Sequence, residues 1–187
     1  MRQNSTANEN ELTHSLRLHS SDLLAYFERR VESHVDAADL LSEVMIIAWK
    51  RADRLPGDKI EARMWLFGIA SRVLSAGRRT SRRRTAAVDR LRSEITRAGL
   101  GQPTESETVD AAEDVRAAID KLPNPLPELI RLVHWEGFTL AQTAVVMETS
   151  ASTARSRYAR ARELLRADLA DAPPLPKLLT LESEVST

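Results

Sequence analysis

The stretch TLAQTAVVMETSASTARSRYARARELL, residues 139–165 of the 187-residue chain, decides the fold. Thr139 and Gln142 have the spacing of a capping box, in which two side chains satisfy the free backbone donors at the start of a helix. This first helix is expected to end near Glu148, before a turn at 149–150. Ser150 then serves as the N-cap of a second helix. The stretch therefore predicts two helices joined by a tight turn.

The second of these helices has one apolar and one polar face. Its apolar stripe repeats every three or four residues and consists of Ala154, Tyr158, Ala161 and Leu165. The opposite face carries Ser152, Arg155, Ser156, Arg160 and Glu163. This pattern is typical of a helix-turn-helix, whose second helix presents its first residues to base edges in the major groove. An Arg-rich, solvated helix in a simple helical hairpin is the alternative.

Composition favours an all-α protein. Aromatic residues make up only 4% of the chain, and the short apolar clusters contain helix formers rather than alternating β-branched residues. No apolar run approaches the ~18 residues of a membrane-spanning helix, and the first 15 residues lack the apolar core of a secretory signal. The chain has no cysteine, which excludes disulfides and thiol nucleophiles. We therefore expect a cytoplasmic protein.

The charges are balanced overall but segregated along the chain. There are 27 basic and 27 acidic residues, yet residues 62–84 contain seven Arg and no acid. Residues 99–114 contain five acids and no base, and residues 151–169 carry a net charge of +3. Because local charge decides phosphate binding, both basic blocks are candidate nucleic-acid surfaces.

Breaks in helical periodicity divide the chain into two small helical domains joined by a flexible acidic linker. Before the helix-turn-helix, helices are predicted over residues 21–33 with Ser21 as the cap, and over 36–54, 61–84, 111–122 and 128–135. The predicted parts are a disordered N-terminus at 1–15, a first domain at 16–98, the linker at 99–110, a second domain at 111–170 and a tail at 171–187.

The helix at 36–54 has an unusual outer face. Its predicted core face consists of Ala37, Leu40, Leu41, Val44 and Ala48. A narrow acidic stripe of Asp36, Asp39 and Glu43 runs beside it, and Ile46 and Trp49 point away from the core. An exposed Trp is typical of a protein–protein contact. A solvated acidic face, with Trp49 covered by a neighbouring helix, is the alternative.

The helix at 61–84 combines arginines with an aromatic residue. We predict that it buries Leu66, Ile69, Ala70 and Val73, with Arg72, Ser75 and Arg79 on the opposite side and Trp65 at their flank. Further positive charge comes from Arg78, Arg82, Arg83 and Arg84. Arg beside an aromatic side chain suits a site that grips phosphates and stacks an unpaired base.

Three segments together resemble the extracytoplasmic-function sigma factors, the small two-domain class of bacterial transcription initiation factors. They are DAADLLSEVMIIAWK at 36–50, ARMWLFGIASRVLSAGRRTSRR at 62–83 and IDKLPNPLPELIRLVHWEGFTLAQTAVVMETSASTARSRYARARELLR at 119–166. The resemblance spans roughly residues 20–169, and the order and spacing of the segments make it specific. It implies that residues 16–98 are sigma region 2 and residues 111–170 are sigma region 4.

The resemblance also implies a role for each surface. Docking on the clamp helices of core RNA polymerase would use Asp36, Asp39, Leu40, Glu43, Ile46 and Trp49. Recognition and melting of the promoter −10 element would use Lys59, Trp65, Arg72, Ser75, Arg78, Arg79, Arg82 and Arg83, with the loop 56–60 near a flipped-out base. Reading of the −35 element as duplex would use Ser152, Thr153, Arg155, Ser156, Arg157 and Arg160.

The implied partners are core polymerase, through its clamp helices and flap, promoter DNA and an anti-sigma factor that holds the protein inactive. No cofactor, metal or membrane insertion is expected. An enzyme is not expected either, since the four histidines lack metal-ligand spacing and the chain has no phosphate-binding glycine loop or nucleophile elbow. The strongest alternative function is a helix-turn-helix regulator that binds duplex operator DNA without polymerase. An interaction protein of the anti-sigma kind is a third possibility.

Overall fold

The computed structural model describes the backbone of residues 2–96 and 111–169 and the side chains of residues 8–77 and 114–169. Every regular element in these residues is helical, and the chain separates into two compact units, Met1–Glu105 and Ser106–Thr187. The elements of the first unit are α1 (Arg2–Glu28), α2 (His34–Lys50), the 3₁₀ turn η1 (Ala52–Arg54) and α3 (Lys59–Thr96). Those of the second unit are α4 (Ala111–Lys121), α5 (Leu126–His134), α6 (Leu140–Val146) and α7 (Ala151–Asp168).

The first helix corrects the prediction of a disordered N-terminus at residues 1–15. Helix α1 begins at Arg2, so Ser21 lies inside the helix and is not its cap. Leu12 and Leu16 are buried and continue the apolar stripe that leads to Leu23. Packing of this stripe against the rest of the unit stabilises a segment whose polar composition alone does not favour a helix.

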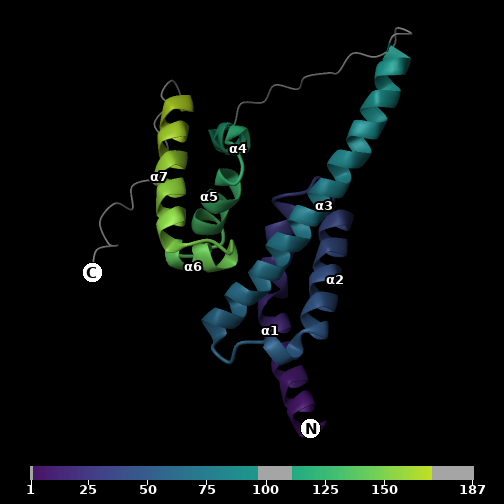
Figure 1. The fold of residues 1–187 in the computed structure, drawn as a ribbon, viewed down its shortest axis with the longest axis vertical. Coiled ribbons are helices and arrows are strands. Elements are labelled where there is room, and N and C mark those ends of the chain that lie inside the picture. The colour runs from purple at the N-terminus through teal and green to yellow at the C-terminus, as the bar shows by residue number, and fades with distance from the viewer. Residues whose placement is uncertain (1, 97–110, 170–187) are drawn as a thin grey trace. The chain divides into compact units, whose positions relative to one another are not determined.

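Helices α1, α2 and α3 pack against one another in the first unit, and Figure 1 shows α1 and α2 lying along α3. Ser33 caps α2, its hydroxyl accepting a hydrogen bond from the Val35 backbone N–H at 3.1 Å. The core of α2 is formed by Ala37, Val44 and Ala48, as predicted, whereas Leu40 and Leu41 are only half-buried. The predicted helix at 36–54 is interrupted at Arg51, after which the chain continues as η1.

An aromatic cluster joins α1 to α3. The Tyr26 ring meets the Phe27 and Phe67 rings edge-on, with centroids 5.2 and 5.5 Å apart. The Arg30 guanidinium lies 3.7 Å from the Tyr26 ring centroid, and that of Arg63 lies 4.9 Å from the Phe67 centroid. Such cation–π contacts add to apolar burial, so the cluster fixes the first half of α3 on α1.

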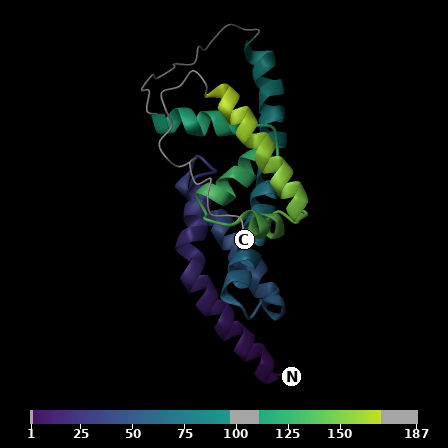
Figure 2. The ribbon, with the colours of Figure 1, turned by 90° about the vertical axis from the view of Figure 1, so that its left-hand side faces the viewer.

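The four helices of the second unit enclose a separate core. Helix α7 contacts α4, α5 and α6, and Figure 2 shows it crossing the shorter helices. The capping box of Thr139 and Gln142 and the N-cap at Ser150 are both present, as predicted. Helix α6 ends at Val146, slightly earlier than predicted, and the turn contains Glu148 with a φ of 51°. The two helices and this turn form the expected helix-turn-helix.

Candidate functional site

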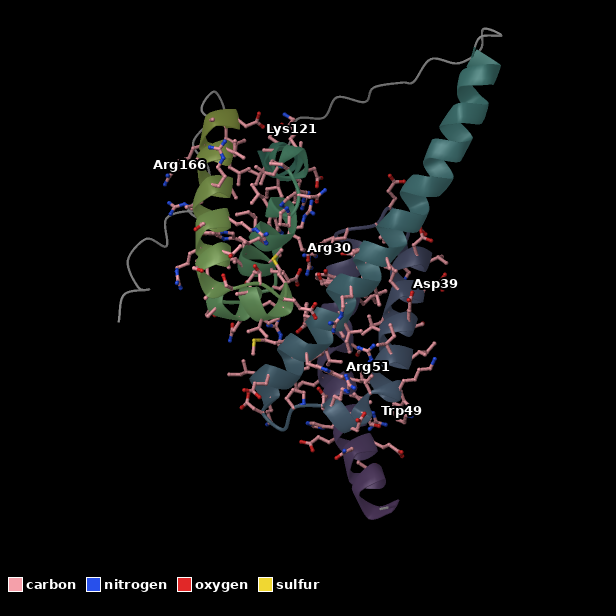
Figure 3. The ribbon with its side chains drawn as sticks, viewed as in Figure 1. Arg30, Asp39, Trp49, Arg51, Lys121 and Arg166 are labelled. Atoms are coloured by element: carbon pink, nitrogen blue, oxygen red, sulfur yellow. The ribbon has the colours of Figure 1, made fainter. Side chains whose placement is uncertain are left out.

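The outer face of α2 combines exposed apolar side chains with carboxylates. Ile46 and Trp49 are 55% and 51% exposed among the described side chains, so the part of the alternative prediction that has Trp49 covered by a neighbouring helix is wrong. Asp36, Asp39 and Glu43 are also exposed. Figure 3 shows Asp39 and Trp49 projecting from the same outer side of α2. Exposed aromatic side chains beside charged groups are typical of protein–protein contacts.

The structure adds Val35 to this face, at 67% exposed. Val35, Asp39, Ser42, Ile46 and Trp49 follow one another at intervals of four, three, four and three residues. This spacing places the five side chains along one side of the helix. The spacing is present in the sequence, but the predicted helix began at residue 36, so Val35 was not included in the predicted surface.

Leu40 differs from the other residues predicted for this surface. It is half-buried, and a Cβ atom built on Gly77 of α3 would lie 3.5 Å from the Leu40 Cδ2 atom. Leu40 therefore packs between α2 and α3 and supports the outer face from its edge.

Helix α3 buries one side and exposes the other, as its periodicity predicted. Leu66, Ile69, Ala70 and Val73 are buried. Of the residues predicted to contact DNA, Lys59, Arg72 and Ser75 are exposed and Trp65 is half-buried. The side chains of Arg78, Arg79, Arg82 and Arg83 lie outside the described residues, although their backbone continues α3.

The loop before α3 is held by Asp58. Its Oδ1 atom accepts hydrogen bonds from the backbone N–H groups of Ile60 at 2.9 Å and Glu61 at 3.0 Å, which satisfies the free donors at the helix start. Ile60 is 57% exposed beside this cap. The loop thus combines a fixed backbone with an exposed apolar side chain.

Helix α7 buries Ala154, Ala161 and Leu165 fully and Tyr158 in part, so the predicted stripe is confirmed. Ser152, Arg155, Ser156 and Arg160 are exposed, and Thr153 and Arg157 are half-buried. Two of these polar side chains form contacts within α7. Arg160 pairs with Glu163 at 3.1 Å, and the Ser156 hydroxyl donates to the Ser152 carbonyl at 3.1 Å. Because a surface ion pair of this kind contributes only about 0–1 kcal/mol, Arg160 can exchange Glu163 for a phosphate at little cost.

The surroundings of two histidines, His19 and His134, lower their pKa values. Burial lowers the pKa of His19, and the charge of Arg63 lowers it further, while Asp22 acts in the opposite sense. Burial also lowers the pKa of His134, with a second contribution from Arg162.

Within the part of the chain that the structure describes, no three His, Cys, Asp or Glu side chains gather as metal ligands would. None of the described helices is long and apolar enough to cross a membrane.

The sequence of each unit matches a family description. Residues 16–85 match Sigma-70 region 2, and residues 112–165 match Sigma-70, region 4. The ECF RNA polymerase sigma factor EcfG of Rhodopseudomonas palustris (strain TIE-1) is 32% identical over 161 residues, covering 83% of this chain and 86% of the relative. The ECF RNA polymerase sigma-E factor of Escherichia coli (strain K12) is 28% identical over 141 residues, covering 70% of this chain and 72% of that protein.

Solved structures of similar fold cover most of the chain. The sigma factor RpoE of Bartonella quintana, crystallised with the anti-sigma factor NepR, superposes with a TM-score of 0.55 at 22% identity, covering 87% of this chain and 99% of that one. CnrH, in complex with the cytosolic domain of CnrY, gives a TM-score of 0.60 at 24% identity, covering 92% and 96%. At these identities the structures establish a shared fold.

Proposed function

The chain belongs to the extracytoplasmic-function sigma factors of the sigma-70 family, which direct RNA polymerase to promoters, and from this membership we propose how its surfaces divide the work. The region 2 domain at 16–98 docks on core polymerase and opens the −10 element. The region 4 domain at 111–170 reads the −35 element, and the acidic linker at 99–110 connects them.

The outer face of α2 carries the docking proposal. Its half-exposed Ile46 and Trp49 lie beside exposed carboxylates on one side of the helix, a combination that suits a protein partner such as the polymerase clamp helices. Burying Trp49 against such a surface removes apolar area from water, and the carboxylates select a partner of opposite charge. Docking on the clamp helices is therefore the role we assign to this face.

Helices α3 and α7 carry the DNA proposals. In both, one face is buried in the core of its unit and the other presents arginine, so the arginines point at whatever the helix docks upon. Arg155 lies in the first turns of α7, where a recognition helix meets base edges, and an Arg there can make a bidentate contact to guanine. Arg72 and Trp65 lie seven residues apart along α3, where one helical face combines phosphate binding with base stacking.

We also propose that an anti-sigma factor holds the protein inactive. The Bartonella quintana relative was crystallised with such a partner, and the exposed apolar face of α2 offers a similar partner a surface that polymerase also needs. Native mass spectrometry of the chain purified from its own cells should show two exclusive complexes, one with core polymerase subunits and one with a small inhibitor. A single complex holding inhibitor and polymerase together would contradict this mode of inhibition.

The test of the main proposal compares the free chain with the reconstituted holoenzyme. The free chain should bind promoter DNA poorly, because its net charge is zero and acidic residues compete for the basic faces. Addition of core polymerase should produce specific binding and permanganate-reactive thymines near −10. Tight, specific binding by the free chain as a dimer on two half-sites, without polymerase, would instead identify an independent regulator.

A further inference from the structure

A polar contact between side chains joins α5 to the middle of α7. The His134 Nε2 atom lies 3.1 Å from the Tyr158 hydroxyl oxygen, and the two rings stack at 24° with centroids 5.9 Å apart. Both side chains are half-buried. The contact is thus shielded from water on one side, which strengthens a hydrogen bond.

The neighbours of Tyr158 on the buried stripe have no polar side-chain atom that could form a directional contact. Ala154 and Ala161, one turn before and one turn after it, are fully buried but end at Cβ. Apolar contacts of such small side chains set the distance between helices and are non-directional, whereas a hydrogen bond has a preferred angle. The Tyr158 hydroxyl therefore gives a directional contact to α5 from the half of α7 that carries Arg155 and Arg160.

We infer that His134 is a positioning residue for −35 recognition, because its hydrogen bond to Tyr158 fixes the rotation of α7 about its own axis. The inference rests on the proposed function of α7. A helix free to rotate by even a small angle swings its long arginine side chains away from a given base edge, so loss of the bond lowers discrimination more than overall DNA affinity.

The charges around His134 give this role a pH dependence. Tyr158 and Arg162 face it from α7, and the Arg162 guanidinium also lies 6.0 Å from the Tyr158 ring centroid. From α4, Asp120 pairs with Arg131 of α5. The acidic residues of α5 and of the segment between α5 and α6 are Glu128 and Glu136, and α6 (LAQTAVV) has no ionisable side chain. Protonation of His134 places a second positive charge beside Arg162 and loosens the contact.

The test uses reconstituted holoenzyme and promoters selected by the wild-type holoenzyme from a library randomised across the −35 element. Discrimination is the ratio of transcription from selected and scrambled −35 sequences. At about pH 7.5, Tyr158→Phe and His134→Leu should each lower the discrimination ratio about fivefold, which corresponds to the usual net contribution of one hydrogen bond. His134→Gln, which keeps a hydrogen-bonding group, should retain it. Because the pKa of His134 is lowered below 6.5, discrimination by the wild type should be unchanged down to about pH 6.5 and fall as the pH is lowered further through that pKa, whereas His134→Gln should not show this fall.

Leu164→Ala is the matched control, since Leu164 is partly buried on α7 and packs on the same core but has no polar side-chain atom. It should lower the unfolding temperature and leave the wild-type pH profile of discrimination unchanged. Full discrimination by Tyr158→Phe, or a wild-type pH profile in His134→Gln, would overturn the positioning role alone. A wild-type holoenzyme indifferent to the −35 sequence would overturn the proposed function of α7 together with this inference.

Discussion

Replacing Trp49 with alanine should weaken binding to core polymerase by about 100-fold. Trp49 is 51% exposed in the free chain, and a Trp side chain can bury up to ~250 Å². A partner that covers the exposed half therefore removes about 125 Å² from water, a contribution of about 3 kcal/mol at ~25 cal/mol per Å². Each ~1.4 kcal/mol is tenfold in Kd, which gives the stated factor.

The assay is competition of the unlabelled variant against a fluorescent wild-type chain for core polymerase. Two further variants form a matched pair. Ile46 on α2 and Leu18 on α1 are 55% and 53% exposed, and mutation to alanine removes the same number of side-chain carbons from each. Ile46→Ala should weaken binding, whereas Leu18→Ala should not. Circular dichroism and the unfolding temperature should match the wild type in all three variants. Equal affinities for Trp49→Ala, Leu18→Ala and the wild type would refute the docking surface.

Four other predictions test the remaining surfaces and the fold. Arg155→Ala should cost about 1–3 kcal/mol and relax the preference at one −35 base pair; the control Arg166→Ala, near the other end of α7, should leave every preference unchanged. Arg72→Ala should reduce permanganate reactivity near −10 without altering the −35 preference, and a shifted −35 preference would show that the two units are wrongly assigned. Gly77→Ala should stabilise the first unit by about 0.5–1 kcal/mol in urea unfolding, because the added Cβ meets Leu40 at an ordinary 3.5 Å; destabilisation would contradict that packing. Because burial lowers the pKa of His19 below 6.5, the unfolded chain binds protons more readily, so stability should fall as the pH drops below about 6.5 and through the folded-state pKa. His19→Gln should remove that part of the pH dependence, and an unchanged slope in the variant would contradict it.

Local sequence was sufficient for the helix-turn-helix. A cap acts over three residues and an apolar stripe over four, so the capping box at Thr139, the cap at Ser150 and the stripe through Ala154 and Ala161 could be predicted without knowledge of any neighbour. The same reasoning predicted the buried face of α3 and the outward direction of Ile46. These features depend on contacts within one helix or on the period of that helix alone.

Tertiary structure decided the features that depend on a second element. The first turns of α1 are polar in composition and become helical because Leu12 and Leu16 find a core to pack against. Periodicity shows that Trp49 points away from the core of its helix, but only the packing of the described residues of α1 and α3 shows that about half of Trp49 stays exposed. The pairing of His134 with Tyr158 joins residues 24 positions apart, and a spacing that long reflects how α5 and α7 cross, a property of the packed helices that no local pattern encodes.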